Sequence, residues 1–167
     1  MEVGLSLGSN LGDRLQRLQQ AKKEIMALKG VSFAAQSPVY ETEPVDVSPA
    51  DRNMFFLNAA LIVNVLMRVP EMLACFKQIE AGLGRQAETR PNAPRPIDID
   101  IIYAGNLRIN QNGIVVPHPR WFERRFVVKP LSDVRPDLAV PGQDVSVVEI
   151  LRRLADKHKV KLFAREW

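Results

Sequence analysis

The chain has 167 residues, of which 46% are hydrophobic and 25% charged, and its formal net charge is +4. This composition is typical of a globular protein, so we expect one domain spanning residues 1–167 rather than a disordered chain. No apolar run reaches the ~18–20 residues of a membrane helix, no signal peptide is evident, and the single cysteine cannot form an internal disulfide. We therefore expect a cytoplasmic protein without membrane contact.

The first half of the chain alternates between strand and helix patterns. Strands are indicated by alternating or continuous apolar residues, helices by apolar residues three and four apart, and their ends by Gly, Pro or capping residues. In chain order the expected elements are a strand over residues 2–8, a helix ending at Lys29, a strand over 31–40, a long loop over 41–53, a strand over Phe55–Val65 and a helix from Pro70 to Gly84.

The second half begins with another irregular stretch, residues 85–96, which is rich in Pro and Arg. The elements expected after it are a strand over 97–103, a hairpin around Leu107–Ile109 and Ile114–Val116, a partly helical stretch over 120–132, a helix from Val145 to Lys157 and an edge strand over Val160–Phe163. The order β-α-β-β-α-β with a helical C-terminal extension predicts a ferredoxin-like α+β fold, with helices packed on an antiparallel sheet.

Two acidic side chains lie in the strand over 97–103. Asp98 and Asp100 are two positions apart, so in a strand they share a face and lie ~6.5–7 Å apart along the chain. Neighbouring carboxylates repel each other, and burying them is costly unless a cation lies between them. Mg²⁺ binds carboxylate oxygens and usually shares its coordination shell with substrate phosphates. This strand therefore predicts a phosphate-handling enzyme.

One long segment carries its positive charge on arginine alone. Between Arg85 and Arg125 there are seven Arg and no Lys. The planar guanidinium can bind two phosphate oxygens at once, whereas the ammonium of Lys acts as a point charge. These arginines could instead be solvated side chains of surface loops, but their position around the Asp pair favours phosphate binding.

Four other side chains are candidates for binding, and each has a structural alternative. Glu80 lies on or beside the apolar stripe of the second helix, where it either reaches solvent or fixes an Arg or a ligand. Asn58, within an apolar strand, either makes a structural hydrogen bond or pairs with the lactam edge of a heterocycle. Phe126 is either a core residue or a stacking plate. His118 has no metal-ligand partner at a suitable spacing, so a hydrogen bond to phosphate is its expected functional use.

A Gly-Ser-Asn turn joins the first strand to the first helix. Such a turn can hold a phosphate at the helix N-terminus, but it lacks the P-loop pattern. Asn10 or Asp13 acting as a helix cap explains the turn more simply. Cys75, next to apolar residues of the second helix, is expected to be a small core residue.

Several segments form a pattern over most of the chain, from residue 5 to about residue 140. They are Leu7–Gly12, Ser37–Val45, Phe56–Ala60, Ile79–Glu80 with Gly84–Arg85, Pro94–Ile101, and Val116–Arg120 leading to Arg124–Phe126. Together, in this order and with these spacings, they resemble the 6-hydroxymethyl-7,8-dihydropterin pyrophosphokinase family.

The resemblance implies that the β,γ-diphosphate of ATP is transferred to the pterin hydroxymethyl oxygen, with release of AMP, in folate biosynthesis. It implies that Asp98 and Asp100 hold two Mg²⁺ ions and that Arg85 and Arg95 clamp the transferring phosphates. The ATP-binding residues that it implies are Glu80, Arg85, Arg95, His118 and Arg124. The pterin-binding residues that it implies are Thr42, Pro44, Val45, Asn58 and Phe126. For Glu80, ligand contact and bracing of an Arg both stay open.

The loop over 85–96 departs from the family pattern. Asn92 stands where many family members have a Trp that covers the pterin, and Ala87 stands where an Arg is expected. Pro119 replaces an aromatic residue that often follows the His. These departures bear on how the loop closes and on which residue is the second stacking plate, but they leave the Asp pair and the two outer arginines intact.

Two alternative functions compete with the pyrophosphokinase. A ferredoxin-like module that binds RNA or single-stranded nucleic acid would fit the positive charge, but it needs stacking aromatics on an exposed sheet and has no use for adjacent acids. An inactive structural relative would not need Asp98, Asp100, Arg95 and Asn58. We therefore expect small-molecule partners, ATP and the pterin, with no nucleic acid, and a monomer.

Overall fold

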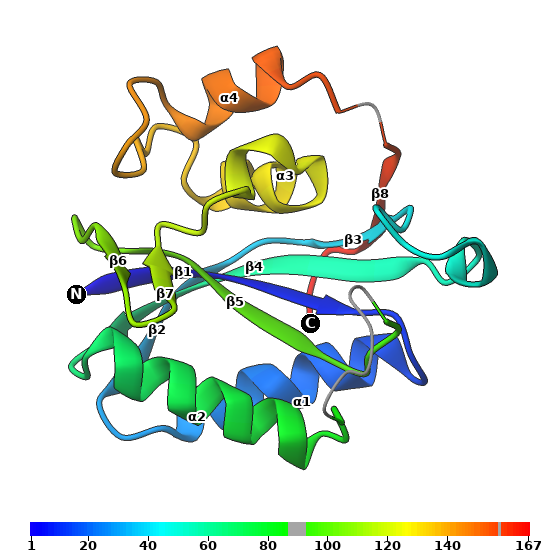
Figure 1. The fold of residues 1–167 in the computed structure, drawn as a ribbon, viewed down its shortest axis with the longest axis horizontal. Coiled ribbons are helices and arrows are strands. Elements are labelled where there is room, and N and C mark those ends of the chain that lie inside the picture. Colours follow the sequence, from blue (N-terminus) through cyan, green and yellow to red (C-terminus); the bar gives the residue numbers. More distant parts are fainter. Residues whose placement is uncertain (87–92, 157) are drawn as a thin grey trace.

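The structure, a computed structural model, describes residues 1–86, 93–156 and 158–167. A six-stranded antiparallel sheet runs through it with the order β5-β1-β4-β3-β8, and β2 pairs with the second half of β4 (Figure 1). The strands are β1 (Glu2–Ser9), β2 (Val31–Gln36), β3 (Val39–Thr42), β4 (Phe56–Val65), β5 (Asp98–Ala104) and β8 (Val160–Ala164).

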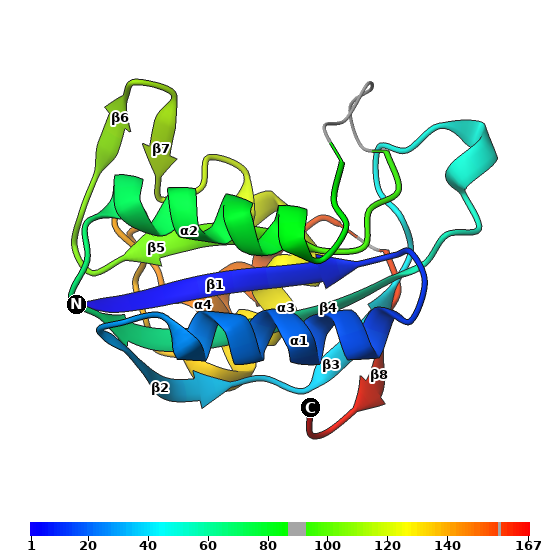
Figure 2. The same cartoon turned by 90° about the horizontal axis from the view of Figure 1, so that it is seen from below.

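Helices cover both faces of this sheet. As Figures 1 and 2 show, one face carries α1 (Arg14–Ala27) and α2 (Val69–Gly82), and the other carries α3 (Arg125–Val134) and α4 (Val147–Arg153). The expected ferredoxin-like α+β fold is thus confirmed. Because helices lie on both faces, the sheet does not present the open face that the nucleic-acid alternative requires.

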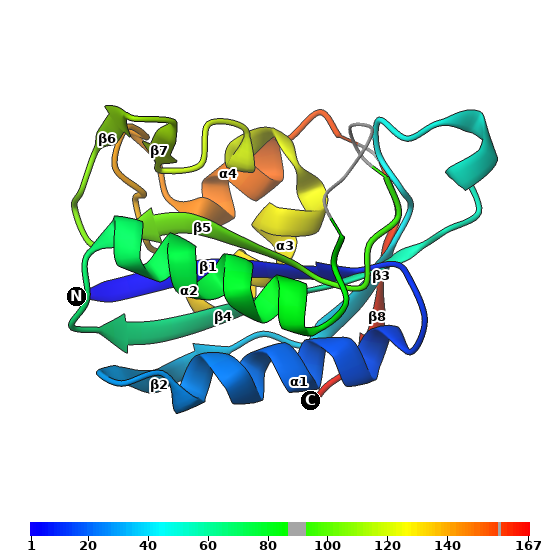
Figure 3. The same ribbon diagram turned by 60° about the horizontal axis from the view of Figure 1, so that its bottom comes forward.

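The remaining elements are short. The expected hairpin consists of β6 (Ile109–Gln111) and β7 (Ile114–Val116) and lies next to β5 (Figure 3). Two single-turn 3₁₀ helices, Pro49–Asp51 and Trp121–Glu123, interrupt the connections before β4 and before α3.

Strand β4 divides the core into two layers. Leu57, Leu61 and Val63 pack in the cluster beneath α1 and α2, whereas Ile62 belongs to the cluster beneath α3 and α4. This is the strict alternation of a strand buried on both faces. Asn58, an even-numbered neighbour of Ile62, therefore points to the α3 side of the sheet.

The helix ends follow local signals. Asp13 caps α1, because its carboxylate accepts a hydrogen bond of 3.0 Å from the Gln16 N–H. Pro70 lies in the first turn of α2, where its missing N–H costs nothing. Both helices end two residues before the predicted position, at Ala27 and Gly82, which is the usual uncertainty of helix boundaries.

The prediction of one strand over residues 31–40 was wrong, because the chain forms β2 and β3 with a break at Ser37 and Pro38. Pro38 has no N–H for the ladder. At Ser37 the side chain replaces a strand partner: its Oγ accepts a hydrogen bond of 2.9 Å from the Ala60 N–H. The two halves then pair with different parts of β4.

The last helix is shorter than the predicted span from Val145 to Lys157, since α4 covers only Val147–Arg153. Beyond it, the Asp156 carboxylate accepts hydrogen bonds from the N–H groups of Arg125, at the start of α3, and of His158. Farther along the chain, β8 adds the predicted edge strand beside β3. Lys157 itself lies outside the described residues.

Within the described part of the chain, no helix is both long enough and apolar enough to cross a bilayer. The cytoplasmic location stays a prediction.

Candidate active site

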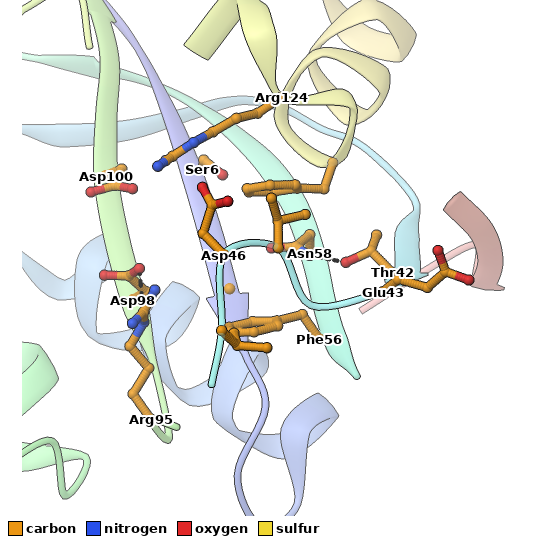
Figure 4. A pocket seen from close by; sticks show the side chains of 14 residues that line it. Ser6, Thr42, Glu43, Asp46, Phe56, Asn58, Arg95, Asp98, Asp100 and Arg124 are labelled. Carbon is orange, nitrogen blue, oxygen red and sulfur yellow. Dashed lines mark hydrogen bonds and ion pairs between the residues drawn. The ribbon is translucent and has the colours of Figure 1, made fainter. Parts of the chain in front are cut away.

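The candidate site lies at one end of the sheet, on the face that α3 covers. The strand register places Gly8 of β1 opposite both Asn58 of β4 and Asp98 of β5, and it places Ser6 opposite Asp100. Residues directly opposite one another point to the same face of a sheet. Both carboxylates and the Asn58 amide therefore face one space, as Figure 4 shows.

A pocket opens above these strands. Its walls come from four strands, from the loop that follows β3, from the end of the loop before β5 and from the start of α3. The lining residues are Ser6, Gly8, Thr42, Glu43, Val45, Asp46, Val47, Phe56, Asn58, Arg95, Asp98, Asp100, Arg124 and Phe126. The pocket thus combines four acids and two arginines with two aromatic rings and an amide.

The two carboxylates have different surroundings. Asp98 contacts two guanidinium groups, with Arg85 Nη1 2.6 Å from its Oδ1 and Arg95 Nε 3.0 Å from its Oδ2. Asp100 has weaker compensation: burial and the neighbouring charge of Asp98 raise its pKa to about 7, against the opposing field of Arg124. The site therefore has a carboxylate whose ionisation requires additional positive charge.

The Glu80 side chain is largely withdrawn from solvent, with the residue only 8% exposed. Its Oε1 accepts a hydrogen bond of 2.7 Å from the Ile99 N–H on the edge strand β5 and lies 2.6 Å from Arg85 Nη1. Burial raises the pKa of Glu80, although Arg85 opposes the shift. Of the alternatives that the sequence left open, the structure shows a brace: Glu80 ties α2 to β5 and holds Arg85 toward Asp98.

The opposite wall of the pocket is aromatic and amide-lined. The Asn58 Nδ2 group donates a hydrogen bond of 2.7 Å to Thr42 Oγ1, which fixes the orientation of the amide. Phe126, at the start of α3, lines the same space, and the Arg124 guanidinium lies 5.7 Å from its ring centroid. This wall presents flat apolar surface beside hydrogen-bonding groups.

Residues 4–136 match the family model of 7,8-dihydro-6-hydroxymethylpterin-pyrophosphokinase (HPPK). The chain belongs to this family. Among relatives, it is 36% identical to a 2-amino-4-hydroxy-6-hydroxymethyldihydropteridine pyrophosphokinase of Methylorubrum extorquens, over 84% of this chain and 87% of the relative. It is 37% identical to the enzyme of the same name from Bacillus subtilis, over 78% of this chain and 75% of the relative.

Other relatives of the HPPK family are longer. A folate synthesis bifunctional protein of Arabidopsis thaliana is 38% identical over 80% of this chain, which spans only 27% of that protein. The crystal structure of wild-type Plasmodium falciparum HPPK-DHPS with pteroate matches this chain with a TM-score of 0.68 and 13% identity. The match covers 91% of this chain and 42% of the Plasmodium chain. The chain thus spans between a quarter and a half of these longer relatives, and the structural likeness supports the fold.

Six lining residues were not predicted as site residues: Ser6, Gly8, Glu43, Asp46, Val47 and Phe56. The sequence pattern suggests that Phe56 is a core residue of an apolar strand, yet it lines the pocket. Its ring centroid lies 5.6 Å from the Cζ atom of the Arg95 guanidinium. Its spacing of two from Asn58 was a usable signal, because both side chains face the same side of β4. Asp46 has a positive φ of 57°, an uncommon conformation for a non-glycine residue, and no sequence pattern indicated it.

Some predicted site residues lie outside the pocket lining. His118 follows a cis Val116–Pro117 bond, and its Nδ1 accepts a hydrogen bond of 3.1 Å from the Arg120 N–H. Burial, Arg124 and Arg120 lower the pKa of His118 to about 4, so its imidazole is neutral at pH 7. Pro44 is not among the lining residues either. The replaced lid positions Ala87 and Asn92 lie outside the described residues.

The candidate ligands for a divalent cation are the carboxylates of Asp98 and Asp100. Among the described residues, no group of three or more His, Cys, Asp or Glu side chains is arranged to hold a metal. Two adjacent carboxylates nevertheless fit Mg²⁺, which keeps several waters and usually takes its other ligands from substrate phosphates. The raised pKa of Asp100 points the same way, because the charge of a bound cation would offset the burial and the repulsion from Asp98 that raise it.

Substitution of Glu80 should separate its bracing role from its charge. Glu80→Ala leaves the buried Ile99 N–H without an acceptor, so we expect a loss of about 1–3 kcal/mol in the free energy of unfolding. Glu80→Gln keeps an acceptor oxygen and should lose less. Because the folded-state pKa of Glu80 is raised, the unchanged chain should lose stability relative to Glu80→Gln as pH rises through that pKa. Urea denaturation between pH 4 and 8 measures both effects, and equal losses in the two variants would contradict the brace.

Proposed function

We propose that this chain transfers a diphosphate group from ATP to the hydroxymethyl oxygen of 6-hydroxymethyl-7,8-dihydropterin, in folate biosynthesis. In this reaction the alcohol oxygen forms a bond to the β-phosphorus and loses its proton. The bond between that phosphorus and the oxygen bridging to the α-phosphate breaks, and AMP leaves. We propose further that residues 1–167 form a single pyrophosphokinase domain that acts as a monomer.

One observation carries the proposal: the acid pair Asp98 and Asp100 and the aromatic wall with Asn58 open into one pocket. A flat heterocycle against that wall would place an attached alcohol near the carboxylates. Membership of the HPPK family and the names of the relatives support the same substrates. An inactive relative would not need this combination.

On the phosphate side, we assign Asp98 and Asp100 as the ligands of two Mg²⁺ ions bound with ATP. When bound, these ions would neutralise phosphate charge and align the transfer. Arg85 and Arg95 already lie at Asp98, so they can contact an oxygen ligand of the same cation. Arg124, which lines the pocket, and the neutral His118 would contribute a charge and a hydrogen bond to the remaining phosphate oxygens.

On the acceptor side, Asn58 is oriented by Thr42, so its carbonyl oxygen and its remaining amide hydrogen can pair with the lactam edge of a pterin. Phe126 and Phe56 supply aromatic surface for the ring. Val45, from the loop after β3, adds apolar contact, and the backbone near Pro44 would complete this wall.

Gly8 makes room for the acceptor wall, and its substitution tests that wall. A Cβ at Gly8 would lie 2.9 Å from Asn58 Oδ1, closer than side chains tolerate. We expect Gly8→Ala to turn the Asn58 amide away and to raise the KM for the pterin about tenfold or more, since a mispaired polar group costs about 1–3 kcal/mol. The KM for ATP should change far less. Steady-state kinetics with each substrate varied in turn would show this, and an equal rise in both KM values would contradict the assignment.

The decisive test of the function is an assay for AMP. The protein is incubated with ATP, Mg²⁺ and 6-hydroxymethyl-7,8-dihydropterin, and nucleotides and pterins are separated by chromatography. We expect AMP and the pterin diphosphate in equal amounts, with no AMP when the pterin is omitted. ADP as the product, or AMP formation that does not depend on the pterin, would refute the proposal.

A further inference from the structure

A buried asparagine outside the predicted site holds the backbone of Arg95. Asn10 follows β1, is 5% exposed and contacts Arg95, 85 residues later in the chain. The Arg95 N–H donates a hydrogen bond of 2.8 Å to Asn10 Oδ1, and the Asn10 N–H donates one of 3.2 Å to the Arg95 carbonyl oxygen. A single residue therefore satisfies both backbone polar groups of Arg95.

This contact matters because Arg95 stands between two prolines. Neither Pro94 nor Pro96 has an N–H group, so within this tripeptide only Arg95 can donate from its backbone. The conformation of Arg95 is also restricted to the extended region, because a proline follows it. The tripeptide is thus a stiff unit whose position depends on how the Arg95 backbone is held.

From this fixed backbone the Arg95 side chain reaches two parts of the pocket. Its Nε lies 3.0 Å from Asp98 Oδ2, and its guanidinium lies over the ring of Phe56. A shift of the Arg95 backbone would therefore move the charge away from both the acid and the aromatic wall.

We propose that Asn10 is a positioning residue, which sets the Arg95 guanidinium against Asp98 on the phosphate side of the pocket. The inference rests on the proposed function for its catalytic consequence. Asn10 is free for this role because Asp13, not Asn10, caps α1.

The effect should be confined to the Arg95 side. Asn10 Nδ2 also approaches the Met54 carbonyl oxygen, at 3.5 Å, but that contact is long for a hydrogen bond. Arg14 Nη1 donates a shorter bond of 2.9 Å to the Phe55 carbonyl oxygen. The start of β4, with Phe56, is therefore held independently of Asn10.

The kinetic test compares Asn10→Ala with Asn10→Asp. In Asn10→Ala, kcat should fall about 10- to 100-fold, because misplacement of a catalytic group by about 1 Å can cost that much. The KM of each substrate should stay within about threefold, the pattern of an interaction needed only in the transition state. Asn10→Asp keeps an acceptor for the Arg95 N–H and should recover most of the loss. Asp13→Ala, which removes the α1 cap on the same turn, is the matched control and should leave kcat unchanged.

A second measurement on the free protein does not depend on activity. Hydrogen exchange of the Arg95 amide, followed by NMR, should be at least about tenfold faster in Asn10→Ala than in the unchanged chain or in Asp13→Ala. Unchanged exchange in Asn10→Ala would overturn the positioning contact. Faster exchange with an unchanged kcat would overturn its catalytic consequence. An unchanged chain that makes no AMP would refute the proposed function instead, and the exchange data would still decide the contact.

Discussion

Asp100→Asn should abolish turnover and at the same time stabilise the free protein. The acid is needed as a cation ligand, so we expect kcat for AMP formation to fall about a thousandfold, which corresponds to the several kcal/mol that a bound metal contributes to a transition state. In the free protein the same acid is a burden, since burial and Asp98 raise its pKa to about 7. An amide of the same shape removes that repulsion.

The sign of the stability effect can be checked against pH. The folded-state pKa of Asp100, about 7, lies above its ordinary value of 3.8. At a pH between these two pKa values, Asp100 is protonated in the folded chain and ionised in the unfolded chain. The contribution of Asp100 to the stability of the unchanged chain should therefore be greatest below pH ~4, and it should decrease as pH rises through about 7. Asp100→Asn should lack this decrease. Denaturant unfolding without Mg²⁺ at pH 5 and pH 8 measures the difference.

Asp98→Asn provides the matched contrast. Asp98 contacts both Arg85 and Arg95, so its neutralisation removes two ion pairs and should destabilise the free protein rather than stabilise it. Its kcat should fall as far as that of Asp100→Asn. Equal stability changes in the two variants would contradict the different electrostatic surroundings, and normal AMP formation in either would refute the assignment of the acids as metal ligands.

Local sequence pattern was sufficient where a side chain's role depends on its own strand. The spacing of Asp98 and Asp100 predicted a shared face, and the register of β5 against β1 puts both beside the pocket. The split between β2 and β3 was harder to foresee, because residues 31–40 carry a continuous strand pattern. Its cause is tertiary: the Ser37 side chain bonds to Ala60, and each half of the segment finds its own partner.

Residues whose role depends on a distant partner were beyond the reach of local pattern. Asn10 is of a residue type that often caps helices, and only the folded chain shows that it accepts a hydrogen bond from the Arg95 N–H. Glu80 could be placed on the helix stripe, but its acceptance of the Ile99 N–H requires the packing of α2 against β5. In both cases the signal is a buried polar side chain that must find a partner, and the sequence does not say which.

Arg95→Ala should also cause a large loss of activity on the phosphate side of the pocket. An arginine on a transferring phosphoryl group can be worth about 10³–10⁵ in kcat, and with Arg85 still present we expect a loss of about 10²–10³. Arg95→Lys should recover little, because an ammonium cannot contact Asp98 and lie flat over the Phe56 ring at once. Arg108→Ala, at an exposed position outside the pocket, is the control and should keep full activity.

A second effect of the same variant has the opposite sign and separates the proposed role from loss of structure. In the free protein Arg85 and Arg95 both contact the Asp98 carboxylate. A cation that binds to this carboxylate must therefore compete with the two guanidinium groups. Removing Arg95 should therefore strengthen binding of Mg²⁺ alone while kcat falls. Calorimetric titration with Mg²⁺ in the absence of nucleotide would measure this. Weaker Mg²⁺ binding in Arg95→Ala would mean that Arg95 supports the shape of the acid pair rather than competing for its charge.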